Sequence, residues 1–271
     1  MDKPIAIQLK NITKTFGEVI ANKNVDMDVR KGEILSVLGE NGSGKTTLMN
    51  MIAGIYYPDE GQIYIDGEEV SIRSPKDAFR YKIGMIHQHF KLVDVFSAAQ
   101  NIVLGVRGEK YNLKEVNARV REMSEKYGFH IDPKKKIHEM SVSEKQTVEI
   151  VKVLYRGADI LILDEPTLGM DGFLIKELAD MIKKLSAEGK TVIMISHDIP
   201  LVFKTVDEAI ILNQGEKIFE GSKESLARRD DIFDHINIQL PPVVLLSKAL
   251  GLDEICYSVE EFAAKIVERN V

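Results

Sequence analysis

The spacing of apolar residues changes several times along this chain, and each change predicts a different kind of element. In residues 5–9 and again in 25–29, apolar and polar residues alternate, as they do in strands with one solvated face. We expect residues 13–17 to turn away from the first of these strands. Two further short strands flank Asp66-Gly67, a dipeptide typical of a hairpin. The front of the chain therefore predicts an antiparallel β patch.

Other apolar runs show no alternation, which is typical of strands covered on both faces in a parallel sheet. The clearest are 160–163 and 191–195, and apolar strands are also expected at 33–38 and 83–87. Helical patterns separate these strands, and repeated strand–helix–strand crossovers predict an α/β fold with a parallel core. The other elements expected here are helices at 45–53, 173–185 and 199–206 and a closing hairpin around Gln214-Gly215.

Two parts of the chain are predicted to be helical. In residues 89–157 the strand patterns stop and amphipathic helices are expected at 112–127 and 143–155, so we interpret this region as a helical subdomain inserted into the sheet domain. After Gly221 the pattern is again helical, with a capping box at Ser258 and Glu261. We therefore divide the chain into a domain at 1–222 and a C-terminal helical extension at 223–271, which either packs on the domain or contacts a partner.

Composition narrows the possible functions. The chain has 271 residues with a net charge of −6, which argues against nucleic acid as the main partner. No run approaches 18 apolar residues, so no segment is expected to span a bilayer. The N-terminal residues lack the apolar core of a signal peptide. The single Cys256 excludes a metal site built from several thiolates of this chain.

The segment Gly39 to Thr47 fits G-x-x-x-x-G-K-[ST], the pattern of a phosphate-binding loop. Its glycines let backbone N–H groups face a phosphate, and the helix that follows adds the positive end of its dipole. Lys45 would reach the β- and γ-phosphates, and the Thr46 hydroxyl would bind Mg²⁺. The alternative is a glycine-rich turn before an ordinary helix, which the strand–loop–helix setting disfavours. The residues expected to hold the nucleotide here are Gly39, Asn41, Gly42, Ser43, Gly44, Lys45, Thr46 and Thr47.

Two adjacent carboxylates, Asp164 and Glu165, follow a strand of four aliphatic residues. Because an unpaired buried charge is costly, these carboxylates need a counter-charge, and Mg²⁺ would supply it. Asp164 would hold the metal, and Glu165 would orient the attacking water and accept its proton. The alternative is an acidic pair that faces solvent at the end of the strand.

Together these motifs resemble those of the nucleotide-binding subunits of ATP-binding-cassette (ABC) transporters. The resemblance covers residues 5–221 and implies a P-loop NTPase with a mixed, mainly parallel core sheet. It implies that Phe16 stacks on adenine, that Gln88 contacts Mg²⁺ and the attacking water, and that His197 assists catalysis. Residues 140–144 match the family signature, so that Ser141 and Ser143 would contact ATP, and Asp171 lies in the matching D-loop. Taken singly, Phe16 could be a core aromatic, Gln88 a strand cap and His197 a polar strand end.

The resemblance also implies partners. Two cassettes would pack head to tail, each binding ATP and Mg²⁺ between its own P-loop and the signature of the other, with transmembrane permease subunits beside them. The chain would then be a peripheral ATPase subunit of an importer at the cytoplasmic face of the cell membrane. The alternatives are a soluble ABC ATPase acting on nucleic acid or ribosomes, which the acidic composition disfavours, and a regulatory module without turnover, which Glu165 and His197 disfavour.

The signature departs from the family pattern, because Val142 and Ser143 stand where the family has two glycines. We therefore expect the half-site that this chain donates to a second cassette to be weakened. For the cargo, residues 87–93 and 141–150 resemble cassettes of monosaccharide and nucleoside importers. The tail, with Leu240-Pro241-Pro242, resembles energy-coupling-factor and cobalt-type cassettes that drive vitamin and metal-ion uptake.

Overall fold

A computed structural model describes residues 3–106, 112–235, 238–252 and 254–269 of this chain. The core is a six-stranded sheet in the order β10-β9-β3-β8-β7-β6. Its strands from β9 to β6 are parallel, and only β10 is antiparallel to its neighbour, so the predicted mixed core sheet is confirmed. Its strands are β3 (Ile34–Leu38), β6 (Ile83–Ile86), β7 (Ile160–Asp164), β8 (Thr191–Ile195), β9 (Glu208–Asn213) and β10 (Glu216–Ser222).

Both faces of the core sheet are covered, which explains why its strands show no alternation. On one face, Val37, Ile162 and Ile193 pack against α1 (Lys45–Ile52) and the N-terminal sheet. On the other face, Leu161 and Val192 pack in a cluster that includes residues of α6 (Gly172–Ala187) and α7 (Ile199–Thr205). Each core strand therefore buries apolar side chains in two directions.

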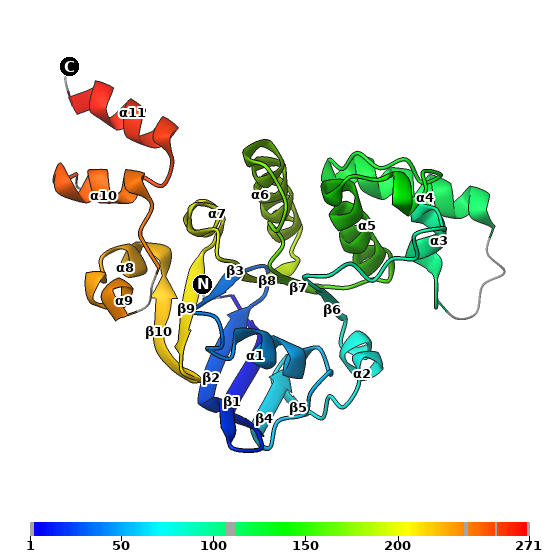
Figure 1. The fold of residues 1–271 in the computed structure, drawn as a ribbon, viewed down its shortest axis with the longest axis horizontal. Coiled ribbons are helices and arrows are strands. Elements are labelled where there is room, and N and C mark those ends of the chain that lie inside the picture. The colour runs from blue at the N-terminus through cyan, green and yellow to red at the C-terminus, as the bar shows by residue number, and fades with distance from the viewer. Residues whose placement is uncertain (1–2, 107–111, 236–237, 253, 270–271) are drawn as a thin grey trace.

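The predicted antiparallel patch is a four-stranded sheet in the order β2-β1-β4-β5 (Figure 1). The prediction that residues 13–17 turn away from the strand is wrong, because β1 continues to Phe16 and the chain turns at Gly17. Register shifts interrupt its pairing with β2 after Leu9, and Asn11 adopts a left-handed φ of 51°. Such bulges break the alternation of apolar and polar side chains. For this reason the sequence pattern at 13–17 indicated a turn instead of a strand. The strands are β1 (Ile5–Phe16), β2 (Val19–Arg30), β4 (Glu60–Ile65) and β5 (Glu68–Val70).

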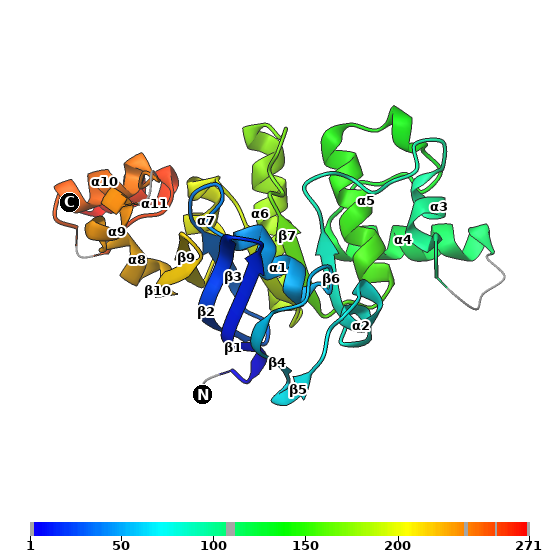
Figure 2. The ribbon, with the colours of Figure 1, turned by 60° about the horizontal axis from the view of Figure 1, so that its bottom comes forward.

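The helical subdomain lies at one end of the molecule in both ribbon views (Figures 1 and 2). It contains α3 (Ala98–Val103), α4 (Leu113–Tyr127) and α5 (Val142–Tyr155). Helix α4 begins at its cap Asn112 and ends at Gly128, whose φ is 76°, as expected. The short helices α3 and α2 (Pro75–Arg80) were not predicted, because one or two turns contain too few apolar positions to show a helical period.

The C-terminal extension lies at the opposite end of the molecule from the helical subdomain (Figure 2). Leu226, Ile232 and Val244 join the main core cluster, and the Tyr257 ring stacks on Phe203 of α7 at 5.8 Å. The extension therefore packs on the cassette, as one of the two expectations had it. Its helices are α8 (Lys223–Ala227), α9 (Asp230–His235), α10 (Pro242–Ala249) and α11 (Val259–Arg269).

The capping box expected before α11 is half formed. The Ser258 hydroxyl accepts a hydrogen bond from the Glu261 N–H at 3.1 Å, but the Glu261 carboxylate binds the N–H of Tyr257. Of the helices within the described ranges, none is both long and apolar enough to cross a membrane.

Candidate nucleotide-binding site

One open cleft of ≈ 710 Å³ brings together residues that are far apart in the sequence. It lies where β3, β6, β7 and β8 end, because parallel strands present their carboxyl ends at the same edge of a sheet. Asp164 is the last residue of β7 and lies beside Thr46. The predicted residues that line this cleft are Phe16, Asn41, Gly42, Gly44, Lys45, Thr46, Thr47, Gln88, Glu165 and His197.

The phosphate-binding loop needs its glycines for close packing. A Cβ atom on Gly39 would lie 2.1 Å from the carbonyl oxygen of Leu212, and one on Gly44 would lie 2.1 Å from that of Ala21. Both residues also have left-handed φ angles, of 143° and 98°. The Ser43 hydroxyl is buried and has no hydrogen-bond partner among the residues that the structure describes. A loop with an unsatisfied hydroxyl before an uncapped helix N-terminus suits an anion.

Lys45 is held in place by the loop itself. Its ammonium donates hydrogen bonds to the carbonyl oxygens of Gly39 and Glu40, at 2.8 and 2.7 Å. Burial lowers the pKa of Lys45, and the charges of Glu165 and Asp164 oppose that shift. A buried ammonium at this position can exchange its carbonyl contacts for phosphate oxygens, which are the stronger acceptors.

The side chains of Thr46 and Asp164 lie close together next to the phosphate-binding loop. The Thr46 hydroxyl is 3.5 Å from a carboxylate oxygen of Asp164, and burial raises the pKa of Asp164. Within the described ranges no group of three or more His, Cys, Asp and Glu side chains could form a metal site. The pair suits Mg²⁺, since this ion commonly takes one or two protein oxygens and completes its shell with phosphate oxygens and water.

Glu165 has a strained backbone that directs it toward His197. Its φ is 49°, which a non-glycine residue rarely adopts. The conformation is supported on both sides, because the Glu165 N–H binds the Ile195 carbonyl and the carboxylate accepts the His197 N–H at 3.2 Å. His197 Nε2 lies 3.1 Å from the other carboxylate oxygen. Burial raises the pKa of Glu165, and the charge of His197 opposes this.

Phe16 is fixed at the mouth of the cleft by two residues that the sequence analysis missed. Its ring is 44% exposed and meets Tyr56 edge to face at 5.1 Å. The Asp59 carboxylate accepts hydrogen bonds from the N–H and hydroxyl of Thr15, at 2.7 and 2.8 Å, and pairs with Lys14. Only the pairing of β1 with β4 brings Asp59 to this position, so the sequence carries no local signal for it.

Ser141 and Ser143 of the signature and Asp171 of the D-loop are not among the described residues that line this cleft, whereas Leu168 and Gly169 at the start of the D-loop do line it. Ser141 caps α5, and its hydroxyl accepts the Glu144 N–H at 3.3 Å. Asp171 caps α6 in the same way, accepting the Leu174 N–H at 3.0 Å. Ser143 lies in the first turn of α5. This chain therefore assembles the P-loop side of a site and leaves its signature elsewhere on the molecule.

The ABC transporter family model matches residues 22–168, more than half of the chain, and the chain belongs to this family. It is an ATP-binding cassette by fold. It is 42% identical over 221 residues to the nucleoside import ATP-binding protein NupA of Lactococcus lactis, which covers 80% of this chain and 44% of that protein. It is 44% identical over 215 residues to the guanosine import ATP-binding protein NupO of Bacillus subtilis, covering 78% of this chain and 42% of that protein.

Two solved structures show the same architecture. The chain matches cbiO1 of Clostridium perfringens, part of the ABC transporter complex cbiONQ, with a TM-score of 0.75 and 26% identity, covering 91% of this chain and 100% of that chain. A nucleotide-free ABC transporter cassette gives a TM-score of 0.76 and 25% identity, covering 86% and 99%. By contrast, the chain spans about half the length of the curated relatives it matches.

Proposed function

We propose that this chain binds and hydrolyses ATP as the peripheral subunit of an importer, at the cytoplasmic face of a cell membrane. The observation that supports this most is the meeting of Lys45, Glu165 and His197 in one cleft beside Thr46 and Asp164. A charged lysine, a partly buried base and a pair of oxygen ligands are the groups that phosphoryl transfer requires.

Each side chain of the cleft would have its own role in ATP hydrolysis. Glu165 accepts a proton from the water that attacks the γ-phosphorus as the bond to the β-phosphate oxygen breaks. His197 holds the Glu165 carboxylate through its backbone N–H and ring, and Gln88 contacts the same water. Lys45 stabilises the charge that develops on the phosphate oxygens. Mg²⁺, held by Thr46 and Asp164, would neutralise the phosphates when bound.

A second cassette would complete each site. Because Ser141, Ser143 and Asp171 lie outside this chain's own cleft, they are available to a nucleotide bound by another cassette. A dimeric post-hydrolysis cassette, MJ0796 bound to ADP and Pi, resembles this chain with a TM-score of 0.69 and 28% identity, covering 80% of this chain and 98% of that one. That likeness supports a pair of cassettes, which we propose to pack head to tail with permease subunits beside them.

For the cargo, we propose nucleosides or sugars. The relatives named for nucleoside and guanosine import are 42% and 44% identical, and a ribose import protein of Caldanaerobacter subterraneus is 39% identical over 228 residues. The alternative, vitamin or metal-ion uptake, rests on the tail with its Leu240-Pro241-Pro242, and the likeness to cbiO1 is at 26% identity over 91% of this chain. The greater identity to the first group favours nucleosides or sugars.

Replacing Lys45 tests the proposed function. Because the ammonium would stabilise charge in the transition state, Lys45→Ala should lower the ATPase rate of the assembled complex roughly 10²–10³-fold. Lys183→Ala, an exposed lysine on α6, serves as the control and should leave the rate unchanged. A Lys45→Ala complex with a near-normal rate would contradict the assignment.

A further inference from the structure

Two elements outside the nucleotide cleft support the phosphate-binding loop. The start of the loop packs on β9, because a Cβ atom on Gly39 would collide with the carbonyl of Leu212. Its end packs on β2, because a Cβ atom on Gly44 would collide with the carbonyl of Ala21. The hairpin of β9 and β10 also reaches β2 (Figure 1). The loop therefore rests on the backbone of two strands that are themselves connected.

The turn of the β9–β10 hairpin is bonded to the loop. The Gly215 N–H donates to the Ser43 carbonyl at 3.2 Å, and the Gly215 carbonyl accepts the N–H of Lys23 in β2 at 2.9 Å. Gln214 and Gly215 have left-handed φ angles of 48° and 83°, as in two-residue hairpin turns of type I′. The hydrogen bond that closes such a turn joins the two residues that flank it. Both backbone groups of Gly215 are therefore available to other segments, and they connect the loop to β2.

Asn22 of β2 holds the next carbonyl of the loop. Its side chain is completely buried, and its Nδ2 donates to the Gly44 carbonyl at 3.3 Å. Its Oδ1 has no hydrogen-bond partner among the residues that the structure describes. An apolar side chain would avoid the cost of that buried oxygen. Packing alone therefore does not explain an asparagine at this position, whereas the bond to Gly44 does.

Fixing these two carbonyls sets the direction of two N–H groups. In a planar trans peptide, the carbonyl of one residue and the N–H of the next point in opposite directions. The turn holds the Ser43 carbonyl, so the Gly44 N–H points away from the turn, and it has no backbone acceptor within the described ranges. The Gly44 carbonyl is held by Asn22 and by the Leu48 N–H at 2.9 Å. The Lys45 N–H is directed in the same way.

We propose that Gly215 and Asn22 are positioning residues that orient the Gly44 and Lys45 N–H groups toward the nucleotide phosphates. The nucleotide as ligand rests on the proposed function, whereas the orientation rests on the two hydrogen bonds. Neither residue is among the described residues that line the cleft, so both act through the loop. Because the N–H groups of such a loop cradle the α- and β-phosphates, loss of either bond should weaken phosphate binding and leave stacking on Phe16 intact.

A second hairpin of the chain provides a matched control. Its turn, Asp66-Gly67, has φ angles of 51° and 85°, close to those of the β9–β10 turn. A Cβ atom on Gly67 would meet nothing within 4 Å, whereas one on Gly215 would lie 3.0 Å from the Ala21 carbonyl. Valine rarely adopts such φ angles, so Gly67→Val and Gly215→Val should both distort their turns. Only Gly215→Val would also displace a bond to the loop.

The ratio of the Kd for AMP to the Kd for ADP tests the proposal. It is measured on the full chain by displacement of a fluorescent ATP analogue. ADP has the β-phosphate that the loop would bind, and AMP lacks it. A smaller binding-competent fraction raises both constants by the same factor, so general destabilisation leaves the ratio unchanged.

Gly215→Val should lower this ratio roughly tenfold or more, since hydrogen bonds to charged groups are the stronger ones. Asn22→Ala should lower it by a smaller factor, because the Leu48 N–H still holds the Gly44 carbonyl. The control Gly67→Val should keep the wild-type ratio.

A wild-type ratio in Gly215→Val or in Asn22→Ala would overturn the proposal. So would an equal fall in Gly67→Val, because the effect would then be common to distorted turns. If Gly215→Val does not fold, Asn22→Ala decides alone. A wild-type chain that binds ADP no more tightly than AMP would instead refute the proposed function.

Discussion

At the scale of single residues, the nucleotide cleft depends on side chains outside it that fix the positions of the residues lining it. Asp59 does not line the cleft, yet its carboxylate fixes Lys14 and Thr15 directly before Phe16. These contacts hold the pKa of Asp59 at about 2, chiefly through its bond with Lys14. Because the pKa is depressed in the folded chain, the stabilisation is present above the ordinary value of 3.8 and is lost as pH falls toward 2.

Asp59→Asn is therefore expected to weaken nucleotide binding without touching the nucleotide. Stacking of a base on an aromatic ring is worth about 1–3 kcal/mol, so loss of Phe16 itself should raise the Kd for ATP roughly 5–150-fold. Asp59→Asn should raise it by a smaller factor, because Phe16 remains but is less well held. Titration with a fluorescent ATP analogue measures both variants. An Asp59→Asn chain with wild-type affinity would contradict this positioning role.

The pH dependence of turnover should reflect the protonation of Glu165. Burial raises its pKa above the ordinary 4.5, and a general base works only when deprotonated. The acid limb of kcat/KM should therefore lie at a higher pH than for an ordinary glutamate. His197→Ala removes a charge that opposes the shift, so the limb should move further upward while the rate falls. A pH–rate profile of the assembled complex measures this, and a limb that stays in place would exclude Glu165 as the titrating base.

At the scale of elements, the first turn of α5 shows how a serine at position 143, in place of the family's glycine, affects the signature. Ser143 is not among the residues with positive φ, so glycine is not needed there for backbone conformation. The Glu144 carboxylate already binds the Ser141 N–H at 2.8 Å and pairs with Lys135 at 2.7 Å. A negative charge at a helix N-terminus disfavours an approaching phosphate. We therefore attribute the expected weakening of the half-site at the start of α5 to the Ser143 side chain and the Glu144 charge, which lie close to where a phosphate would bind.

Ser143→Gly should accordingly raise the steady-state ATPase rate of the assembled complex, because a phosphate could approach the helix more closely. Glu144→Gln should act in the same direction by removing the charge. Lys114→Gln, on the exposed start of α4, removes a charge of the helical subdomain without touching α5 and should have no effect. If neither change in α5 raises the rate, the proposed weakening of this half-site is wrong.

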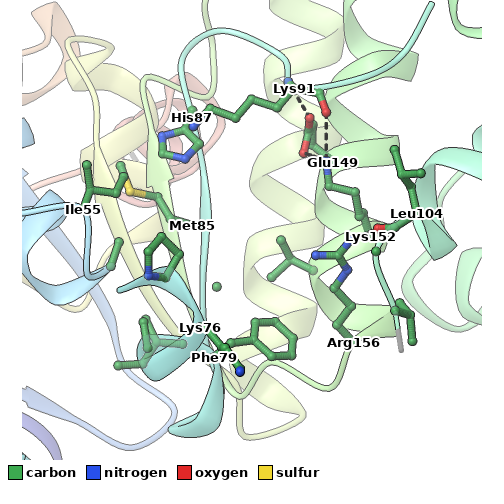
Figure 3. A pocket seen from close by; sticks show the side chains of 18 of the residues that line it. Ile55, Lys76, Phe79, Met85, His87, Lys91, Leu104, Glu149, Lys152 and Arg156 are labelled. Carbon is green, nitrogen blue, oxygen red and sulfur yellow. Dashed lines mark hydrogen bonds and ion pairs between the residues drawn. The ribbon is translucent and has the colours of Figure 1, made fainter. Parts of the chain in front are cut away.

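Sequence patterns predicted the elements whose signals are local. Gly128 ends α4 and Asp66-Gly67 forms the hairpin, since each depends only on its own neighbours. The patterns also predicted the P-loop, Asp164 and Glu165, and the family resemblance added His197. They could not predict the extent of β1, where pairing with two strands overrides an irregular pattern. Nor could they predict the bond of Asp59 with Thr15 or that of Glu149 with the Lys91 N–H (Figure 3), because these contacts connect segments that only the folded chain brings together.

At the scale of the whole molecule, a complete ATP site requires two associated cassettes. One chain provides the P-loop side of a site and displays its signature away from that site, so ATP should hold two cassettes together. Glu165→Gln blocks proton transfer but keeps the loop, and it should form an ATP-dependent dimer with a second cassette. Sedimentation velocity with and without MgATP detects the dimer, and Lys45→Ala/Glu165→Gln should remain monomeric. An ATP-dependent dimer that persists without Lys45 would contradict the composite site.

We expect this cleft to bind ATP through Lys45, and equilibrium binding of ATP with Mg²⁺ measures that contribution. Measured by calorimetry, Glu165→Gln should bind one ATP per chain. Lys45→Ala/Glu165→Gln, folded to the same extent by circular dichroism, should bind at least tenfold more weakly. Equal affinity in the two variants, or no binding in either, would show that Lys45 does not hold ATP in this cleft.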